Sequence, residues 1–334
     1  MVHRHPRSAK KVRPSPLVSV ACLLAASLLL AACGSSSPSG GNGLEKTHIT
    51  VGALPIPDAA PLFIAIHKGF FKQEGLAVTP ETIQASPQST PYLVSGAMDF
   101  SLLNYVSTLE TEQNSGVRFR IVADSTQAAP GVFVLLVPEH SPVTSPADLK
   151  GKTIGAPEAS NGIGNLAVAS TLKPYGVPPD QVKSVALPFP DMEGALKRGV
   201  VAAAWVTEPF ITEIRHNIGA RVLADTMTGP MASFPISGWG TVQQYVRKYP
   251  KTVAAFQRAM AKAQRLAASN RQLVEQTLPT YTKIKPKVAS VMALGTYPVS
   301  LRATRLQHVA DVMLQFGFLH KKSDVAPMVL SGAR

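Results

Sequence analysis

Cysteine is nearly absent from this chain: its 334 residues include only Cys22 and Cys33. Cys22 lies in an apolar leader that we expect to be removed, so the mature chain can form neither an internal disulfide nor a cysteine-based metal site. Chemistry at a cysteine nucleophile is excluded for the same reason. The eight histidines show no HExxH motif or other metal-ligand spacing, and no GxGxxG or Walker sequence is present. The sequence therefore predicts no metal, no cofactor and no catalytic residue.

Acidic residues are also few, with 20 Asp and Glu against 33 Lys and Arg, and the formal net charge is +13. Beyond the leader the basic residues form no dense runs, and no nucleic-acid-binding motif accompanies them. Such a charge suits an anionic membrane surface or simple solubility. We therefore expect no nucleic-acid partner.

The first 32 residues have the layout of a secretory signal. Five basic residues precede an uncharged apolar run from Leu17 to Ala32, which is short for a membrane-spanning helix. The run ends in LAACG, which resembles a bacterial lipobox and implies that Cys33 receives lipid; the alternative is an incidental small residue. Residues 33–46 contain the segment SSSPSGGNG and predict a flexible tether. These features indicate a protein anchored by lipid at the extracytoplasmic face of the bacterial cell membrane.

The globular part opens with a strand, a loop and a helix between Ile49 and Leu76. The apolar residues change from a strand-like to a helical period, and Gly69 is predicted to end the helix. The loop between them, residues 54–58, lies where the carboxyl end of a strand meets the amino end of a helix, the usual ligand crevice of an open α/β sheet. Asp58 in this loop could bind a ligand or simply cap the helix.

Strand–loop–helix units of this kind recur in both halves of the chain. We predict strands over residues 98–103, 118–123, 132–137, 182–187, 202–206, 221–224 and 234–240, with helices from residue 241 onward. Loops at successive strand ends converge if the sheets are parallel and doubly wound. The loops offer polar candidates for ligand binding: Gln88, Ser89, Thr90, Asn104, Tyr105, Ser160, Asn161, Asp191 and Glu208. Helix capping remains an alternative for each of them, including Glu208 before Pro209.

The chemistry of these loops leaves the ligand open. Helix amino ends and Ser or Asn loops suit an anion such as a sulfonate. The carboxyl groups of Asp58, Asp191 and Glu208, together with nearby aromatic residues, would instead suit a flat heterocycle rich in hydrogen-bond donors. Trp205 is expected to be buried rather than ligand-facing, because Ala204 and Val206 flank it in a strand.

Four segments resemble, in order and spacing, the extracytoplasmic solute-binding proteins of ABC importers: VGALPIPDAAPLFIAIHKGFFKQEGL, LVSGAMDFSLLNYVS, SPADLKGKTIG and ALKRGVVAAAWVTEPF. The nearest branch handles sulfonates, nitrate, taurine and thiamine-pyrimidine precursors. The resemblance covers residues 47–318. Ala202 departs from it, since the family often carries Asp at that place.

The resemblance implies a two-lobed α/β periplasmic-binding-protein fold of type II, with doubly wound sheets and two hinge crossovers. It divides the chain into a signal (1–32), a tether (33–46), lobe 1 (47–130), lobe 2 (131–231) and a return to lobe 1 (232–334). A monomer would capture a small polar solute between the lobes and deliver it to a permease driven by a cytoplasmic ATPase. The family's ligand loops match Asp58 and the polar candidates named above.

Two other functions are alternatives to solute import. A solute-binding sensor or accessory lipoprotein without transport would have the same sequence features. A pyrimidine-synthesis enzyme on the same fold is disfavoured, because that related group depends on a cysteine cluster and this chain has none.

Overall fold

The computed structural model describes residues 43–158, 160–330 and 332. The predicted signal, Cys33 and most of the predicted tether lie outside the described residues. No helix in the described part is both long enough and apolar enough to cross a membrane.

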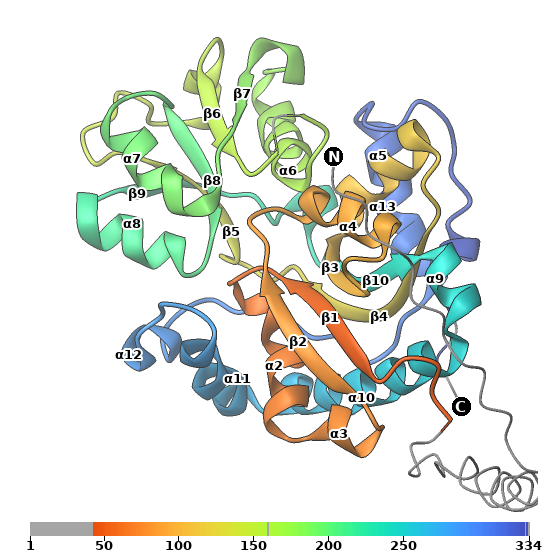
Figure 1. Cartoon of the computed structure of the whole chain (residues 1–334). Coiled ribbons are helices and arrows are strands. Elements are labelled where there is room, and N and C mark those ends of the chain that lie inside the picture. The colour runs from red at the N-terminus through yellow and green to blue at the C-terminus, as the bar shows by residue number, and fades with distance from the viewer. Residues whose placement is uncertain (1–42, 159, 331, 333–334) are drawn as a thin grey trace, which may run out of the picture. The chain divides into compact units, whose positions relative to one another are not determined.

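The first sheet has the strand order β2-β1-β3-β10-β4 (Figure 1). Its strands are β1 (His48–Ala53), β2 (Ala77–Thr82), β3 (Phe100–Asn104), β4 (Phe119–Gln127) and β10 (Pro235–Val242). β1 pairs in parallel with β2 and β3, whereas β10 runs antiparallel to both β3 and β4. We call this sheet and its helices lobe 1.

The second sheet repeats this plan with the order β7-β6-β8-β5-β9. Its strands are β5 (Phe133–Val137), β6 (Thr153–Ala156), β7 (Lys183–Ala186), β8 (Ala203–Thr207) and β9 (Arg221–Asp225). β6 is parallel to β7 and β8, and β5 is the single antiparallel strand. We call this sheet and its helices lobe 2.

Two crossovers join the lobes, and the two-lobed α/β fold is confirmed. The chain leaves lobe 1 between β4 and β5, through residues 128–132, and returns between β9 and β10, through residues 226–234. The predicted lobe boundaries fall inside or beside these segments. The strand that follows each crossover, β5 in lobe 2 and β10 in lobe 1, runs antiparallel to its neighbours, and the other strands of each sheet are parallel to one another.

Helices cover both faces of the lobe 1 sheet. α2, α3 and α10 pack together on one face, and α5 and α13 pack together on the other (Figure 1). The helices of lobe 1 are α2 (Ala60–His67), α3 (Phe70–Gln73), α4 (Ser89–Ser95), α5 (Tyr105–Ser115), α9 (Gln243–Lys248), α10 (Pro250–Ser269), α11 (Arg271–Thr277), α12 (Pro286–Ala289) and α13 (Ala303–Gln315). Those of lobe 2 are α6 (Ile163–Leu172), α7 (Met192–Lys197) and α8 (Phe210–Ile218).

The long helix α10 shows how the spacing of apolar residues directs a helix onto the lobe 1 sheet. Its apolar side chains recur at helical spacing and lie against the sheet, so Phe256, Met260 and Ala263 are fully buried. The Phe256 ring stacks on Phe100 of β3 with centroids 4.0 Å apart. Burial of side chains of this size stabilises the fold by roughly 1.5–3 kcal/mol each. α10 is therefore a scaffold element, as predicted.

The end of the predicted tether belongs to the folded domain. Lys46 Nζ lies 2.6 Å from Asp99 Oδ1, and Glu45 accepts hydrogen bonds from the backbone amides of Lys251 and Thr252. Residues 45 and 46 therefore pack on lobe 1 instead of linking it flexibly. No local sequence pattern predicts the contact between Glu45 and Lys251, because the two residues lie 206 positions apart.

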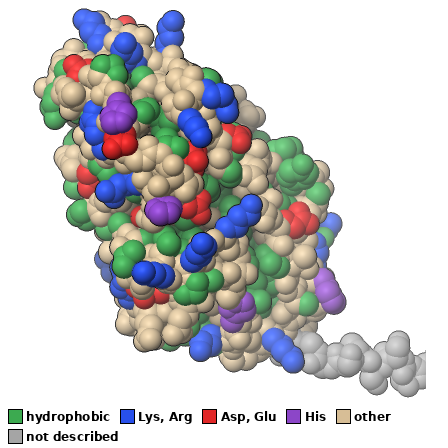
Figure 2. Space-filling view, turned by 90° about the vertical axis from the view of Figure 1, so that its left-hand side faces the viewer, with side chains coloured by type: hydrophobic (Ala, Val, Ile, Leu, Met, Phe, Trp, Pro, Cys, Tyr) green, Lys and Arg blue, Asp and Glu red, His purple; other side chains and the backbone are tan. Residues whose placement is uncertain are grey.

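On the face drawn in Figure 2, charged side chains of both signs are interspersed. Figure 2 shows Lys and Arg side chains mixed with Asp, Glu and apolar side chains over the face it presents. The basic excess of the sequence therefore forms no continuous band on that face.

Candidate functional site

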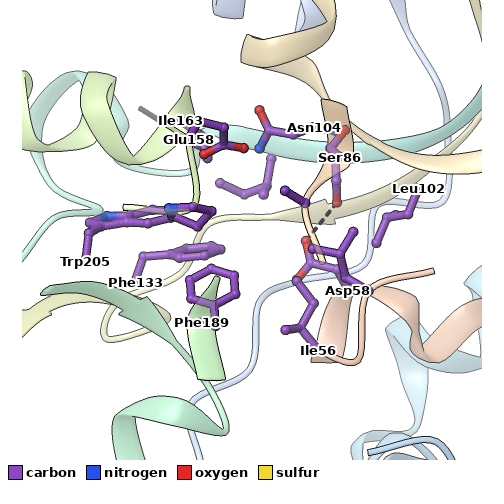
Figure 3. A pocket seen from close by; sticks show the side chains of 15 residues that line it. Ile56, Asp58, Ser86, Leu102, Asn104, Phe133, Glu158, Ile163, Phe189 and Trp205 are labelled. Atoms are coloured by element: carbon purple, nitrogen blue, oxygen red, sulfur yellow. Dashed lines mark hydrogen bonds between the residues drawn. The ribbon is translucent and has the colours of Figure 1, made fainter. Parts of the chain in front are cut away.

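A cavity of about 40 Å³ lies between the lobes and is lined by strand ends from both (Figure 3). Lobe 1 contributes Leu54, Ile56, Asp58, Ala85, Ser86, Leu102, Asn104, Ile236 and Ser237. Lobe 2 contributes Phe133, Pro157, Glu158, Ile163, Phe189 and Trp205. The convergence of loops predicted from the repeated strand–loop–helix units is therefore present around this cavity.

Asp58 anchors the lobe 1 wall and does not cap a helix. It sits in a short 3-10 turn (Pro57–Ala59), and α2 begins after Ala59 with no side-chain cap. Its Oδ2 accepts hydrogen bonds from Thr126 Oγ1 at 2.5 Å and Ser237 Oγ at 2.8 Å; the second is the dashed line in Figure 3. Burial raises the pKa of Asp58, although these two hydrogen bonds oppose the change. The capping interpretation is wrong because the 3-10 turn carries the carboxylate toward β4 and β10.

The loop that carries Asp58 is held at three consecutive carbonyl groups. Tyr281 Oη donates to the carbonyl of Ile56 and Tyr297 Oη to that of Pro57, both at 3.0 Å. Ser125 Oγ donates to the carbonyl of Asp58 itself at 2.6 Å. Since each of these donors belongs to a distant part of the chain, the fold holds the loop in place before any ligand arrives.

Asn104 also lines the cavity, and it caps a helix at the same time. Its Oδ1 accepts from the amides of Val106 and Ser107 in the first turn of α5, and its own amide donates to Ser86 Oγ at 2.9 Å. Asn104 can therefore cap α5 and also form part of the cavity wall. The amides of Val106 and Ser107 in the first turn of α5 are thus occupied by the protein itself.

Lobe 2 supplies an aromatic wall. The Trp205 indole stacks on Phe133 with centroids 4.6 Å apart and an interplanar angle of 4°, and Phe189 lies beside it at 6.3 Å. Trp205 Nε1 donates to Thr226 Oγ1 at 3.0 Å. Trp205 is 1% exposed, as expected from its place in a strand, yet it also borders the cavity.

Glu158 is the acidic cavity residue that sequence reasoning missed, as it also missed Ser86 and Ser237. Its Oε1 accepts from Ser107 Oγ on α5 at 3.3 Å, a hydrogen bond that joins the two lobes. The residue as a whole is partly buried, but Oε2 is shielded from solvent and has no hydrogen-bond partner among the described residues. Burial raises the pKa of Glu158 from the usual 4.5 to about 7, while the Ser107 hydrogen bond opposes this.

Gly162 leaves room for this carboxylate. A Cβ atom at Gly162 would lie 2.6 Å from Glu158 Oε2, closer than real contacts allow. The only sequence signal for Glu158 was its place two residues after the end of β6, in a loop already expected to face the ligand.

Four of the predicted site residues lie near the cavity but outside its lining. Gln88 is exposed and its Oε1 accepts from the amide of Gln84, and Ser89 Oγ donates to the carbonyl of Ser86. Thr90 is partly buried one position further along α4. Tyr105 is buried, and its hydroxyl donates to Asp124 at 2.8 Å. In the loop before α4, the residues that line the cavity are Ala85 and Ser86, in place of Gln88, Ser89 and Thr90.

The remaining predicted residues lie elsewhere. Ser160 and Asn161 line a separate groove of about 380 Å³ that includes Phe316 and Phe318, just beyond α13. Asp191 is exposed at the start of α7. The Glu208 carboxylate accepts from the amide and hydroxyl of Thr212 in the first turn of α8, which agrees with its capping interpretation.

A second groove between the lobes, which we call the outer groove, measures about 400 Å³ and shares Phe189 with the cavity. Its lining includes Phe210, Glu193 and Glu213 from lobe 2. Lobe 1 contributes Tyr281 and Lys283 among others. The outer groove is therefore aromatic and more acidic than basic.

Among the described residues, no three His, Cys, Asp or Glu side chains are grouped so as to hold a metal ion. The lobes, the crossovers and the cavity define the class of the protein, which has the two-lobed fold of periplasmic binding proteins. The alkanesulfonate-binding protein SsuA from Xanthomonas axonopodis pv. citri, solved bound to MOPS, superimposes with a TM-score of 0.71. Its sequence is 19% identical, and the match covers 86% of this chain and 99% of that one. At this identity the likeness concerns the fold alone.

Residues 56–272 match the family model described as NMT1/THI5 like, and the chain belongs to that family. The nitrate import ATP-binding protein NrtC of Synechocystis sp. is 25% identical over 309 residues, which is 86% of this chain and 45% of that protein. The taurine-binding periplasmic protein of Escherichia coli is 30% identical over 129 residues, which is 38% of this chain and 39% of that protein. The chain spans about half the length of the curated relatives it matches.

Proposed function

We propose that this protein is the solute-binding component of an ABC importer and that it holds a small solute in the cavity between its lobes. The observation that carries the proposal is the lining of that cavity, to which strand ends of both lobes contribute. Relatives named for nitrate import and taurine binding support import as the purpose of binding. The solute classes considered are a sulfonate, nitrate or taurine-like anion and a thiamine-pyrimidine-like heterocycle.

Binding requires the lobes to move. Because both lobes line the cavity of about 40 Å³, separation of the lobes at the two crossovers opens it for an entering solute. Closure then brings Glu158 of lobe 2 back to Ser107 of lobe 1. The closed surface is the form that the permease would recognise, and a cytoplasmic ATPase would drive release. We expect an affinity of about 1 µM, equivalent to roughly 8 kcal/mol.

The proposal includes anchoring by lipid on Cys33 at the extracytoplasmic face of the membrane, as a monomer and without catalysis. Its support is the sequence of the leader, which ends in LAACG. Replacement of Cys33 by Ala should move the protein from the membrane fraction to the soluble fraction without changing solute binding, because Cys33 precedes the folded domain, which includes Glu45 and Lys46.

The test of binding is calorimetric titration of the purified full-length chain with sulfonates, taurine, nitrate, bicarbonate and pyrimidines. Trp205 borders the cavity while Trp239 is buried outside its lining, so a bound solute should also change the tryptophan fluorescence. Replacement of Trp205 by Phe should remove that optical signal. A folded protein that gives neither heat nor a fluorescence change with any of these solutes would contradict the proposal.

A further inference from the structure

Several hydrogen-bond donors around the cavity are already used by the protein. Ser237 Oγ donates to Asp58, Trp205 Nε1 donates to Thr226, and Ser107 Oγ donates to Glu158. The first-turn amides of α5 donate to Asn104. Among the described lining side chains, Asn104 Nδ2 and the Ser86 hydroxyl donate to no protein group, but neither is a charged donor of the kind that binds an anion strongly.

The acceptors, in contrast, remain in excess. The lining contains two carboxyl groups, Asp58 and Glu158, and no Lys, Arg or His is among its described residues. Glu158 Oε2 is the acceptor without a partner, and it is shielded from solvent. A buried acceptor left unpaired is costly, and in native proteins such an atom calls for a specific explanation. An anion placed here would lie against carboxylates.

The outer groove continues this pattern toward solvent. It carries Glu193 and Glu213 against the single basic side chain Lys283 among its described lining residues, and it meets the cavity at Phe189. The proximity of Glu193 helps to raise the pKa of Glu213, after the larger effect of burial. Aromatic faces beside carboxylates are favourable surroundings for an organic cation. The outer groove therefore favours the same kind of ligand group as the cavity.

We infer that the ligand presents a nitrogen-bound hydrogen, as an amine, an amidine or an amino-substituted ring does, and that Glu158 Oε2 accepts this hydrogen. The inference rests on the proposed function and narrows its solute class. The nitrogen group occupies the small inner cavity beside the Trp205 and Phe133 rings, and a larger ligand body extends into the outer groove. Nitrate and simple sulfonates, which offer only acceptors, are excluded from this position.

The test compares probes of one shape and opposite charge on the full-length chain. Benzylamine and benzamidine are titrated against benzenesulfonate and nitrate by calorimetry. The variants are Glu158→Gln, which replaces the free acceptor, and Glu139→Gln, a matched control on an exposed carboxylate of lobe 2 outside both linings. The melting temperature of each variant without ligand checks that it is folded.

We expect benzylamine or benzamidine to bind, and Glu158→Gln to weaken that binding by about 10- to 100-fold, as the loss of a charged hydrogen bond does. Glu139→Gln should leave the affinity unchanged. Binding of benzenesulfonate or nitrate without the amines, or amine binding that is equal in both variants, overturns the inference and leaves solute binding intact. If none of the four probes binds to the folded protein, the result counts against solute binding in this cavity and against the inference together.

Discussion

Replacement of Glu158 by Gln should stabilise the unliganded protein at alkaline pH and have little effect at acidic pH. Burial raises the pKa of Glu158 from 4.5 to about 7, so folding disfavours its ionised form. Below pH 4.5 the folded and unfolded chains both carry the proton, and the group contributes its full stability. As the pH rises through 7, the unfolded chain has already lost the proton and the folded chain must lose it too, so that stability disappears.

The size of the effect follows from the difference between the two pKa values. Each unit of difference corresponds to about 1.4 kcal/mol, so ionised Glu158 lowers the unfolding free energy by up to about 3 kcal/mol above pH 8. Gln at this position carries no charge at any pH and keeps an oxygen that can accept from Ser107. The variant should therefore gain most of that amount at pH 8.5 and little at pH 4.5.

The measurement is urea unfolding of the unsubstituted chain, Glu158→Gln and the control Glu139→Gln at both pH values, followed by tryptophan fluorescence and circular dichroism. Other groups titrate equally in all three proteins, so the difference between variants isolates position 158. A stability difference between Glu158→Gln and the unsubstituted chain that is the same at both pH values would refute the reasoning. It would show that the carboxyl group is not held in a costly environment.

Two further substitutions test how the site is built. Glu208→Ala should lower the unfolding free energy by about 1 kcal/mol, because it removes the hydrogen bonds from Thr212. Solute affinity measured by calorimetry should stay unchanged. A tenfold loss of affinity would show that Glu208 contributes to solute binding. Tyr297→Phe should remove the hydrogen bond to the carbonyl of Pro57, lower the unfolding free energy by about 1 kcal/mol and weaken solute binding, because the Asp58 loop is less firmly held. The exposed Tyr175→Phe is the control, and equal behaviour of the two tyrosine variants would contradict a role in holding that loop.

The fold was largely predictable because its signals are local. The change of apolar period after Ala53 predicts the end of β1 where the structure has it. Gly69 is predicted to end the first helix, and it lies in the left-handed conformation between α2 and α3. The antiparallel direction of β5 and β10 was not predictable from any such pattern, since it depends on how the crossovers return the chain to each sheet.

The candidate site was predictable only at the level of loops. The loop from Pro157 to Gly162 was expected to face a ligand, but the sequence favoured Ser160 and Asn161, whereas Glu158 lines the cavity. Asn161 has a positive φ of 54°, and a single left-handed residue redirects a loop in a way that residue type alone does not specify. The choice between a cap and a ligand group at Asp58 likewise depended on hydroxyl groups of distant strands.

The sequence by itself determined the strand–loop–helix units and the polar character of the strand ends, because apolar periodicity and turn residues act over a few neighbours, and its resemblance to a known family implied the two lobes. Only the tertiary structure decided which polar groups are already satisfied and which remain free in the cavity. That distinction sets the chemistry of the site, and it is made by hydrogen bonds between residues far apart in the chain, such as Ser107 and Glu158 from opposite lobes.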